Sequence, residues 1–119
     1  MRAEDRGQAA VELALALPLV ALLLLAVVQV GLVVRDQVLT VHAAREAARA
    51  VAVDSSPGAG RAAALAGSAL EPRRVTVQVT RSDQSVAVVT YRCPTDLPLV
   101  GALIPDLTLR AKAAMRTER

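Results

Sequence analysis

The chain has 119 residues, a formal net charge of +3, no phenylalanine or tryptophan, and a single tyrosine, Tyr91. Beyond an apolar first third, about 85 residues remain, which is enough for one small domain with a core of Val, Leu and Ala. The basic residues stand singly except for Arg73-Arg74 and are not interleaved with aromatic rings, so the composition argues against a nucleic-acid binder.

A short polar leader, residues 1–7, precedes an apolar run that extends to Val34. The leader has two arginines and two acids and therefore no net charge. A helix from Leu13 to Val34 is about 33 Å long, which matches a hydrocarbon core of about 30 Å. We predict a membrane-spanning helix over residues 8–34. An uncleaved anchor fits better than a cleaved secretory signal, whose apolar region is only roughly 7–15 residues long.

Glu12 is the one carboxylate inside this apolar region, between Val11 and Leu13. An ionised side chain costs about 2.5–3.5 kcal/mol near the bilayer centre and less toward its edge. Two interpretations follow. Glu12 either marks the edge of the membrane segment, with its carboxylate in water, or is neutralised by a cation of a packed partner at the same depth.

After Val34, charged residues mix with good helix formers, alanine and arginine, and no breaker occurs before Asp54. We predict one continuous helix from near Ala9 to Val53, about 65 Å long. Residues 35–53 would form a rod outside the lipid. The apolar positions predicted to share one face of the rod are Val34, Val38, Val41, Ala44 (with Arg45), Ala48, Val51 and Ala52.

Residues 54–60 combine an aspartate, two serines, a proline and two glycines, and this cluster ends the rod. A short helix is predicted over 61–70. Apolar and polar residues then alternate at 75–80, which predicts a strand. A polar turn at 81–85 and a second strand at 86–91 are predicted to complete an antiparallel hairpin.

The last predicted strand begins at Leu107, and its residues alternate cleanly between a buried and a solvated face. Its apolar face holds Leu107, Leu109, Ala111, Ala113 and Met115, and its polar face holds Thr108, Arg110, Lys112 and Arg116. The predicted fold class is α+β. A long transmembrane helix continues into the rod, and a short second helix and a three-stranded antiparallel sheet pack on that rod within a small domain at 54–119.

Residues 93–106 form an apolar loop with three prolines. It would fold back on the sheet, cover the rod, or contact another protein or the membrane. Cys93 is predicted to lie in this loop as a passive free thiol, with an intermolecular disulfide as the alternative.

The sequence offers no catalytic set. His42 is the only histidine, so it has neither a nucleophile nor a metal-ligating partner at a recognisable spacing, and no phosphate-binding glycine motif occurs. The loop acids Asp54, Asp83, Asp96 and Asp106 are expected to bond their own backbone. We predict a protein that is not an enzyme and uses no cofactor or metal.

The string RGQAAVELALALPL at 6–19 resembles the cleavage region of type IV prepilin-like proteins. Together with VHAAREAARAVAV at 41–53 and the final AKAAMRTE, it makes the chain resemble the TadE/TadG family of tight-adherence pilus assembly pseudopilins. The resemblance covers most of the chain.

In prepilin-like proteins a peptidase cuts after a glycine, and a glutamate lies fifth in the mature chain. The resemblance implies that Gly7 is the recognition residue, that Gln8 is the first mature residue, and that Glu12 is the assembly carboxylate. Leu13 departs from the aromatic residue often found after that glutamate, and the uncharged leader departs from the usual basic one.

The resemblance also implies a place and partners. The protein would cross a bacterial cell membrane once, with its N-terminus cytoplasmic and its C-terminal domain extracytoplasmic. Its partners would be other pilin-like subunits, in homo- or hetero-oligomers, the pilus or secretion machinery, and a prepilin peptidase. The arginines flanking the span, Arg2 and Arg6 against Arg35, Arg45 and Arg49, do not favour this orientation by themselves. The alternative function is an unprocessed single-pass anchor for an extracytoplasmic binding domain.

Overall fold

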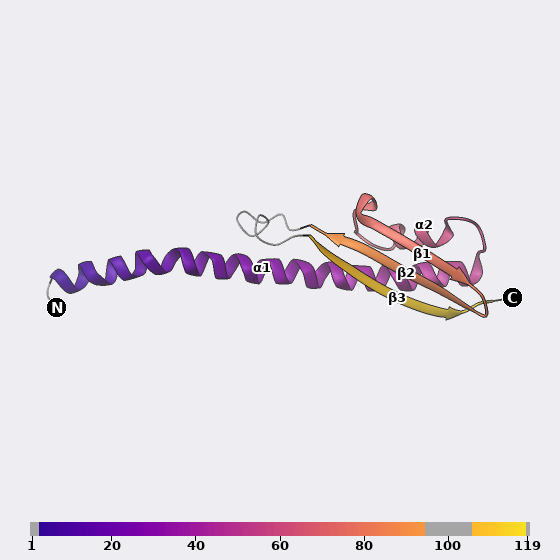
Figure 1. Ribbon diagram of the computed structural model, residues 1–119, viewed down its shortest axis with the longest axis horizontal. Helices are drawn as coiled ribbons and strands as arrows, with labels where there is room; N and C mark the ends of the chain where they lie inside the picture. Colours follow the sequence, from indigo (N-terminus) through magenta and orange to yellow (C-terminus); the bar gives the residue numbers. More distant parts are fainter. Residues whose placement is uncertain (1–2, 95–105, 119) are drawn as a thin grey trace.

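A computed structural model describes residues 3–94 and 106–118 of the chain. It contains a long helix α1 (Ala3–Val53), a short helix α2 (Ala59–Ala66), a 3-10 turn η1 (Pro72–Arg74), and three strands, β1 (Val75–Arg81), β2 (Gln84–Cys93) and β3 (Leu107–Arg116). The molecule measures 83 × 24 × 19 Å. Helix α1 runs along its whole length, and the sheet and α2 lie beside the second half of that helix (Figure 1). The predicted α+β class is confirmed.

Helix α1 begins at Ala3, earlier than the predicted start near Ala9. Glu4 and Asp5 lie in its first turn, where acidic side chains interact favourably with the helix dipole. Residues 3–7 of the predicted leader are therefore the beginning of the same helix. Because no break separates the leader, the span and the rod, the boundaries at 7–8 and 34–35 stay predictions.

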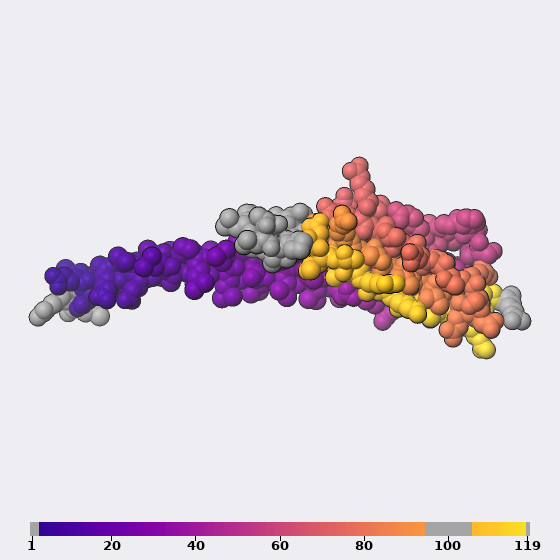
Figure 2. Space-filling model, viewed as in Figure 1, coloured from indigo at the N-terminus to yellow at the C-terminus, as the bar shows by residue number. Residues whose placement is uncertain are grey.

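The first half of α1 stands clear of the remaining protein (Figure 2). Its large apolar side chains are exposed, Leu15 to 75% and Leu19 to 70%. Within the described residues α1 is the one helix long and apolar enough to cross a membrane, and its most apolar stretch is only 6% buried. A core helix of a soluble domain would be covered by other elements. Helix α1 is therefore a candidate single membrane span.

The three strands form one antiparallel sheet in the order β1-β2-β3. Ser82 and Asp83 connect β1 to β2, with Arg81 paired to Ser85 at the turn, so the predicted hairpin is confirmed. Strand β2 is longer than predicted at both ends. The alternation predicted for the last strand is observed from Leu109 to Arg116, where Ala111 is buried while Arg110 and Lys112 are exposed. At its start the prediction was wrong, since Leu107 is 41% exposed.

The core lies between the second half of α1 and the inner face of the sheet. Its helix side is built of alanine, and its sheet side of small and medium residues, so the two layers approach closely. The core cluster consists of Ala43, Ala44, Ala47, Ala48, Ala64, Leu70, Val75, Ala87, Val89, Tyr91, Cys93 and Ala111, and Val51 and Ala52 of α1 are buried as well. The expected core of Val, Leu and Ala is confirmed, with Tyr91 and Cys93 added to it.

The predicted buried face of the rod was wrong at its first residues. Val34 is 56% exposed and Val38 is 62% exposed, whereas Asp36 and Thr40 are buried. The sheet packs on the alanine stripe further along α1, and extending that stripe back by turns of 3.6 residues leads to Thr40 and Asp36. Side-chain size therefore decided which face is covered, because valine keeps the sheet further from the helix than alanine does.

Helix α2 also differs from its predicted range 61–70, since it starts at Ala59 and ends before Gly67. Gly58 precedes it with φ of 85°, a left-handed conformation that glycine adopts without strain. Gly60 lies so close to the rod and sheet that an added Cβ would be 2.9 Å from a methyl of Val51 and from one of Val79. The predicted apolar loop at 93–106 lies, from residue 95 to 105, outside the described residues.

Candidate functional site

Gly7 and Gln8, the residues of the predicted cleavage point, are exposed and lie within α1. Apart from the adjacent residues and the backbone of its own helical turn, no atom lies within 4 Å of the position that a Cβ on Gly7 would occupy, so no other part of the described fold packs on Gly7. Glycine in a helix interior costs about 1 kcal/mol relative to alanine. Gly7 is thus a local weak point in the first turns of α1.

Glu12 is exposed one turn after Gln8. Its neighbours Val11 and Leu13 are 59% and 62% exposed. The carboxylate therefore lies among apolar side chains that no other part of the described fold covers. No hydrogen bond or ion pair joins Glu12 to another residue of the described chain. Residues 8 and 12 share one helix face and are about 6 Å apart along the axis, which brings the predicted cleavage and assembly residues together.

A second carboxylate, Asp36, is buried where the end of β2 meets α1, and sequence reasoning missed it. One of its carboxylate oxygens accepts a hydrogen bond from the thiol of Cys93 at 3.1 Å. Its other carboxylate oxygen is 3.6 Å from a guanidinium nitrogen of Arg35, and its carbonyl accepts a hydrogen bond from the Thr40 hydroxyl at 2.7 Å. The sequence signal was the pair of polar residues at i and i+4 within an alanine-rich helix.

Cys93 is the last residue of β2. The prediction that it lies in the loop was wrong. It pairs with Leu107 of β3 and is 1% exposed. Burial, followed by the hydrogen bond to Asp36 and its negative charge, raises the pKa of the thiol to about 11. The thiolate is therefore scarce at neutral pH, and the passive thiol is the better of the two interpretations.

Gln29 is the third polar residue on the covered face of α1. It is 7% exposed, and neither its amide oxygen nor its amide nitrogen has a hydrogen-bond partner within the described residues. It lies two turns before Asp36 on the same face. This face of the helix is thus already covered at Gln29, while Val28 and Val30 remain exposed on other faces.

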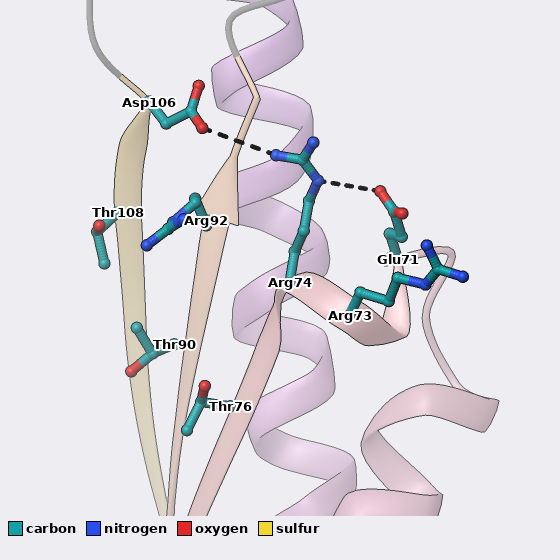
Figure 3. Close-up of a pocket in the computed structure, with 8 residues that line it drawn as sticks. All are labelled: Glu71, Arg73, Arg74, Thr76, Thr90, Arg92, Asp106 and Thr108. Atoms are coloured by element: carbon teal, nitrogen blue, oxygen red, sulfur yellow. Dashed lines mark hydrogen bonds and ion pairs between the residues drawn. The ribbon is translucent and has the colours of Figure 1, made fainter.

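A shallow hollow lies on the outer side of the sheet, at the end where β2 stops and β3 starts (Figure 3). Arg74 bridges two acids there, with nitrogen–oxygen distances of 3.0 Å to Glu71 and 3.9 Å to Asp106. Arg92 extends beside Thr108, and the remaining lining residues are Arg73, Thr76 and Thr90. The hollow thus combines hydroxyl and guanidinium groups with the two carboxylates that Arg74 bridges.

The loop acid Asp54 behaves as predicted, since its carboxylate accepts hydrogen bonds from the amide of Ser56 at 2.8 Å and from the Ser56 hydroxyl at 2.5 Å. These bonds hold the pKa of Asp54 below its usual value. Over the described ranges no group of three or more His, Cys, Asp or Glu residues is arranged to hold a metal. His42 is exposed beside Gln37 and Arg45.

Comparison with protein families gives a match over part of the chain. The model of the TadE-like protein family matches residues 7–49. This segment starts at Gly7, contains Glu12, and ends within α1 before the sheet domain, so it covers less than half of the chain. A comparison with curated proteins finds no match, and a comparison with solved structures finds none. The resemblance drawn from the sequence is confirmed over this segment.

Proposed function

We propose that this chain, whose residues 7–49 match the TadE-like family, is a pilin-like subunit that assembles through α1 with other membrane subunits of a Tad-type pilus. The family points to a protein associated with such a pilus. The observation that carries the finer proposal is the carboxylate of Glu12, which stands without a described partner in the exposed apolar half of α1.

Lipid can cover the apolar side chains of this half but cannot satisfy a carboxylate. An ionised group inside a membrane is expensive unless a cation or hydrogen-bond donor meets it. A neighbouring helix of the same kind would supply one, because cleavage before Gln8 frees an α-amine close to the depth of Glu12. Glu12 would then set the register between packed helices without taking part in chemistry.

The membrane segment itself is best placed at the start of α1. Large apolar side chains stay exposed past Gln29, at Val30, Leu32 and Val34, so the span is proposed over residues 8–34. Its part from Leu13 to Val34 forms about 33 Å of helix, which matches a hydrocarbon thickness of about 30 Å. In this placement the leader is cytoplasmic, and the sheet domain lies close to the outer surface.

Processing by a prepilin peptidase is part of the proposal. A protease binds its substrate in an extended form, and α1 is helical on both sides of Gly7. The glycine lowers the cost of unwinding this turn. Intact mass of the protein from membranes, with and without the peptidase, tests cleavage, because the processed chain starts at Gln8 and the unprocessed anchor starts at Met1.

The test of assembly uses crosslinking in native membranes. Leu15, which is 75% exposed, is replaced by cysteine in a Cys93→Ala background, so that a short bifunctional maleimide reports neighbouring helices. We expect Glu12→Ala to insert normally but to lose at least about 90% of the crosslinked product, since a packed helix loses its compensating charge pair. Glu12→Gln should lose most of the product as well.

Glu46→Ala is the matched control, because it removes an acid of α1 that lies outside the apolar region and remains after cleavage before Gln8, so it should leave crosslinking unchanged. Full crosslinking of Glu12→Ala would contradict the assembly role. It would favour the alternative, an unprocessed anchor whose sheet domain binds its partner alone.

A further inference from the structure

The outer face of the sheet, which turns away from α1, carries a row of cations. We call Arg92, Arg110, Lys112 and Arg116 the basic face. All four are exposed, and none forms an ion pair with an acid of the described residues. The strand positions that share this face contain no acid, because the alternation of the three strands places threonine, glutamine, valine and alanine there.

The strand register aligns these cations. Arg92 on β2 is opposite Thr108, and Thr90 is opposite Arg110 on β3. Lys112 and Arg116 continue the row along β3. From the level of Thr108 to Arg116 the row is about 27 Å long at about 3.4 Å per residue. Along the strands the row is therefore basic, with acids only at its two ends, Asp83 beside Arg116 and the pair Glu71 and Asp106 in the hollow beside Arg92.

The hollow lies at one end of this row. Arg74 is already occupied there by Glu71 and Asp106, and the guanidinium of Arg73 points away from the threonines (Figure 3). Arg92 is the cation that lies over the strands beside Thr108. An incoming carboxylate would find a guanidinium and a hydroxyl together, which are both donors for it.

Three other occupants fit this face less well. The strands run along the axis of α1 (Figure 1), so in a membrane-spanning chain the face stands sideways to the lipid headgroups. It has no aromatic ring for stacking nucleic-acid bases, since Tyr91 points inward and is 5% exposed. A second copy would offer the exposed Arg45 and Arg49 on the opposite side of the rod, which are also basic.

We propose that the basic face docks an acidic segment of a different protein subunit, with one of its carboxylates in the hollow beside Arg92. The orientation of the basic face relative to the membrane rests on the proposed function. The charge complementarity between this face and an acidic segment does not. Basic residues on an edge strand such as β3 also oppose unwanted strand pairing. A protective role of this kind needs charge alone, whereas docking needs these cations at these positions.

The test uses the full-length chain in nanodiscs of phosphatidylcholine. The probe is fluorescent poly-L-glutamate, and the readout is fluorescence anisotropy at increasing salt concentration. Arg110→Glu/Lys112→Glu changes the basic face, and Arg45→Glu/Arg49→Glu is the matched control, because it makes the same change in net charge on the opposite side. Circular dichroism verifies that both variants fold, and Arg110→Gln/Lys112→Gln replaces the first pair if reversal unfolds the sheet.

We expect poly-L-glutamate to bind the wild-type chain and to lose about tenfold or more in affinity with the sheet variant, while the rod variant stays within about twofold. Adding Arg92→Gln to the sheet variant should weaken poly-L-glutamate binding further. Glu12→Ala should leave poly-L-glutamate binding unchanged, so this proposal and assembly through α1 can fail separately. Equal losses in both double variants would overturn the proposal. So would tighter binding to phosphatidylglycerol vesicles or to single-stranded DNA than to poly-L-glutamate.

Discussion

Glu12 and Asp36 are two acids on one helix in opposite situations. Glu12 is exposed in an apolar stretch and has no partner among the described residues, whereas Asp36 is buried and bonded to Cys93. A buried carboxylate with its own hydrogen bonds fixes how local elements pack. An exposed carboxylate in an apolar helix can instead pair with a group of a neighbouring subunit. Of the two, only Asp36 contributes to the fold of the single chain.

The buried thiol predicts how stability changes at high pH. The pKa of Cys93 is raised to about 11, from 9.0 for a free thiol. Between these values the folded chain keeps a proton that the unfolded chain loses, so stability falls as pH rises from 9 to 11. Denaturant unfolding in detergent micelles at pH 8, 9.5 and 11 measures the fall.

Cys93→Ala should remove the part of this fall that starts near pH 9. The fall that remains comes from Tyr91, whose pKa burial raises above 10.0. Asp36→Asn should lower the pKa of Cys93, because it removes the negative charge that disfavours the thiolate. The pH range over which stability falls should therefore become narrower. A wild-type stability that is constant from pH 8 to 11 would contradict the buried position of Cys93.

At the scale of elements, the sequence predicted what depends on local pattern. The first strand of the hairpin and the outer face of β3 follow from alternation between apolar and polar residues, which places Thr108, Arg110 and Lys112 on the solvated side. The buried side of the rod could not be read in the same way. Large valines suggested one face, but the sheet selected the face with alanine, and burial of Asp36 depends on Cys93, which is distant in sequence.

The motif residues show the same division. Gly7, Gln8 and Glu12 could be named from a short string, because a family resemblance is carried by consecutive residues. The basic face could not, since it requires knowing that Arg92 and Thr108 are paired across two strands. The early start of α1 was missed because acids were interpreted as a polar leader rather than as a favourable first turn of a helix.

The close packing of α2 predicts a cost for one added methyl group. Gly60→Ala would place a Cβ 2.9 Å from the methyls of Val51 and Val79. Overpacking costs about 1–3 kcal/mol, against a gain of about 1 kcal/mol from helix propensity. We expect a net loss of up to about 2 kcal/mol in the free energy of unfolding.

Gly67→Ala is the matched control for this substitution. Its added Cβ would meet the Cγ of Glu46 at 3.2 Å, and that flexible side chain can move. Its stability should stay within about 0.5 kcal/mol of the wild type. Equal effects of the two substitutions in urea unfolding would show that α2 does not pack as described.

At the scale of the whole molecule, a single helix joins an apolar end to a folded end. The shape predicts how cysteine labels are distributed in intact cells. In a Cys93→Ala background, cysteine at Leu19 should resist an impermeant maleimide until detergent is added. Cysteine at Arg45 should react in spheroplasts, because the proposed orientation places the rod outside.

Labelling of Arg45→Cys only after the cells are lysed would reverse the orientation and agree with the arginine count around the span. Labelling of Leu19→Cys in intact spheroplasts would show that the first half of α1 does not enter lipid. Wild-type Cys93 should react with neither protocol in the folded protein, because it is 1% exposed.

The unbroken course of α1 from Ala3 to Val53 has a mechanical consequence. Because the helix is not interrupted between the half proposed to lie in lipid and the half that supports the sheet, a displacement of one is transmitted to the other. A machine that pulls the first half of α1 out of the bilayer would therefore move the sheet together with the helix. Any partner held by that sheet would be carried along with it.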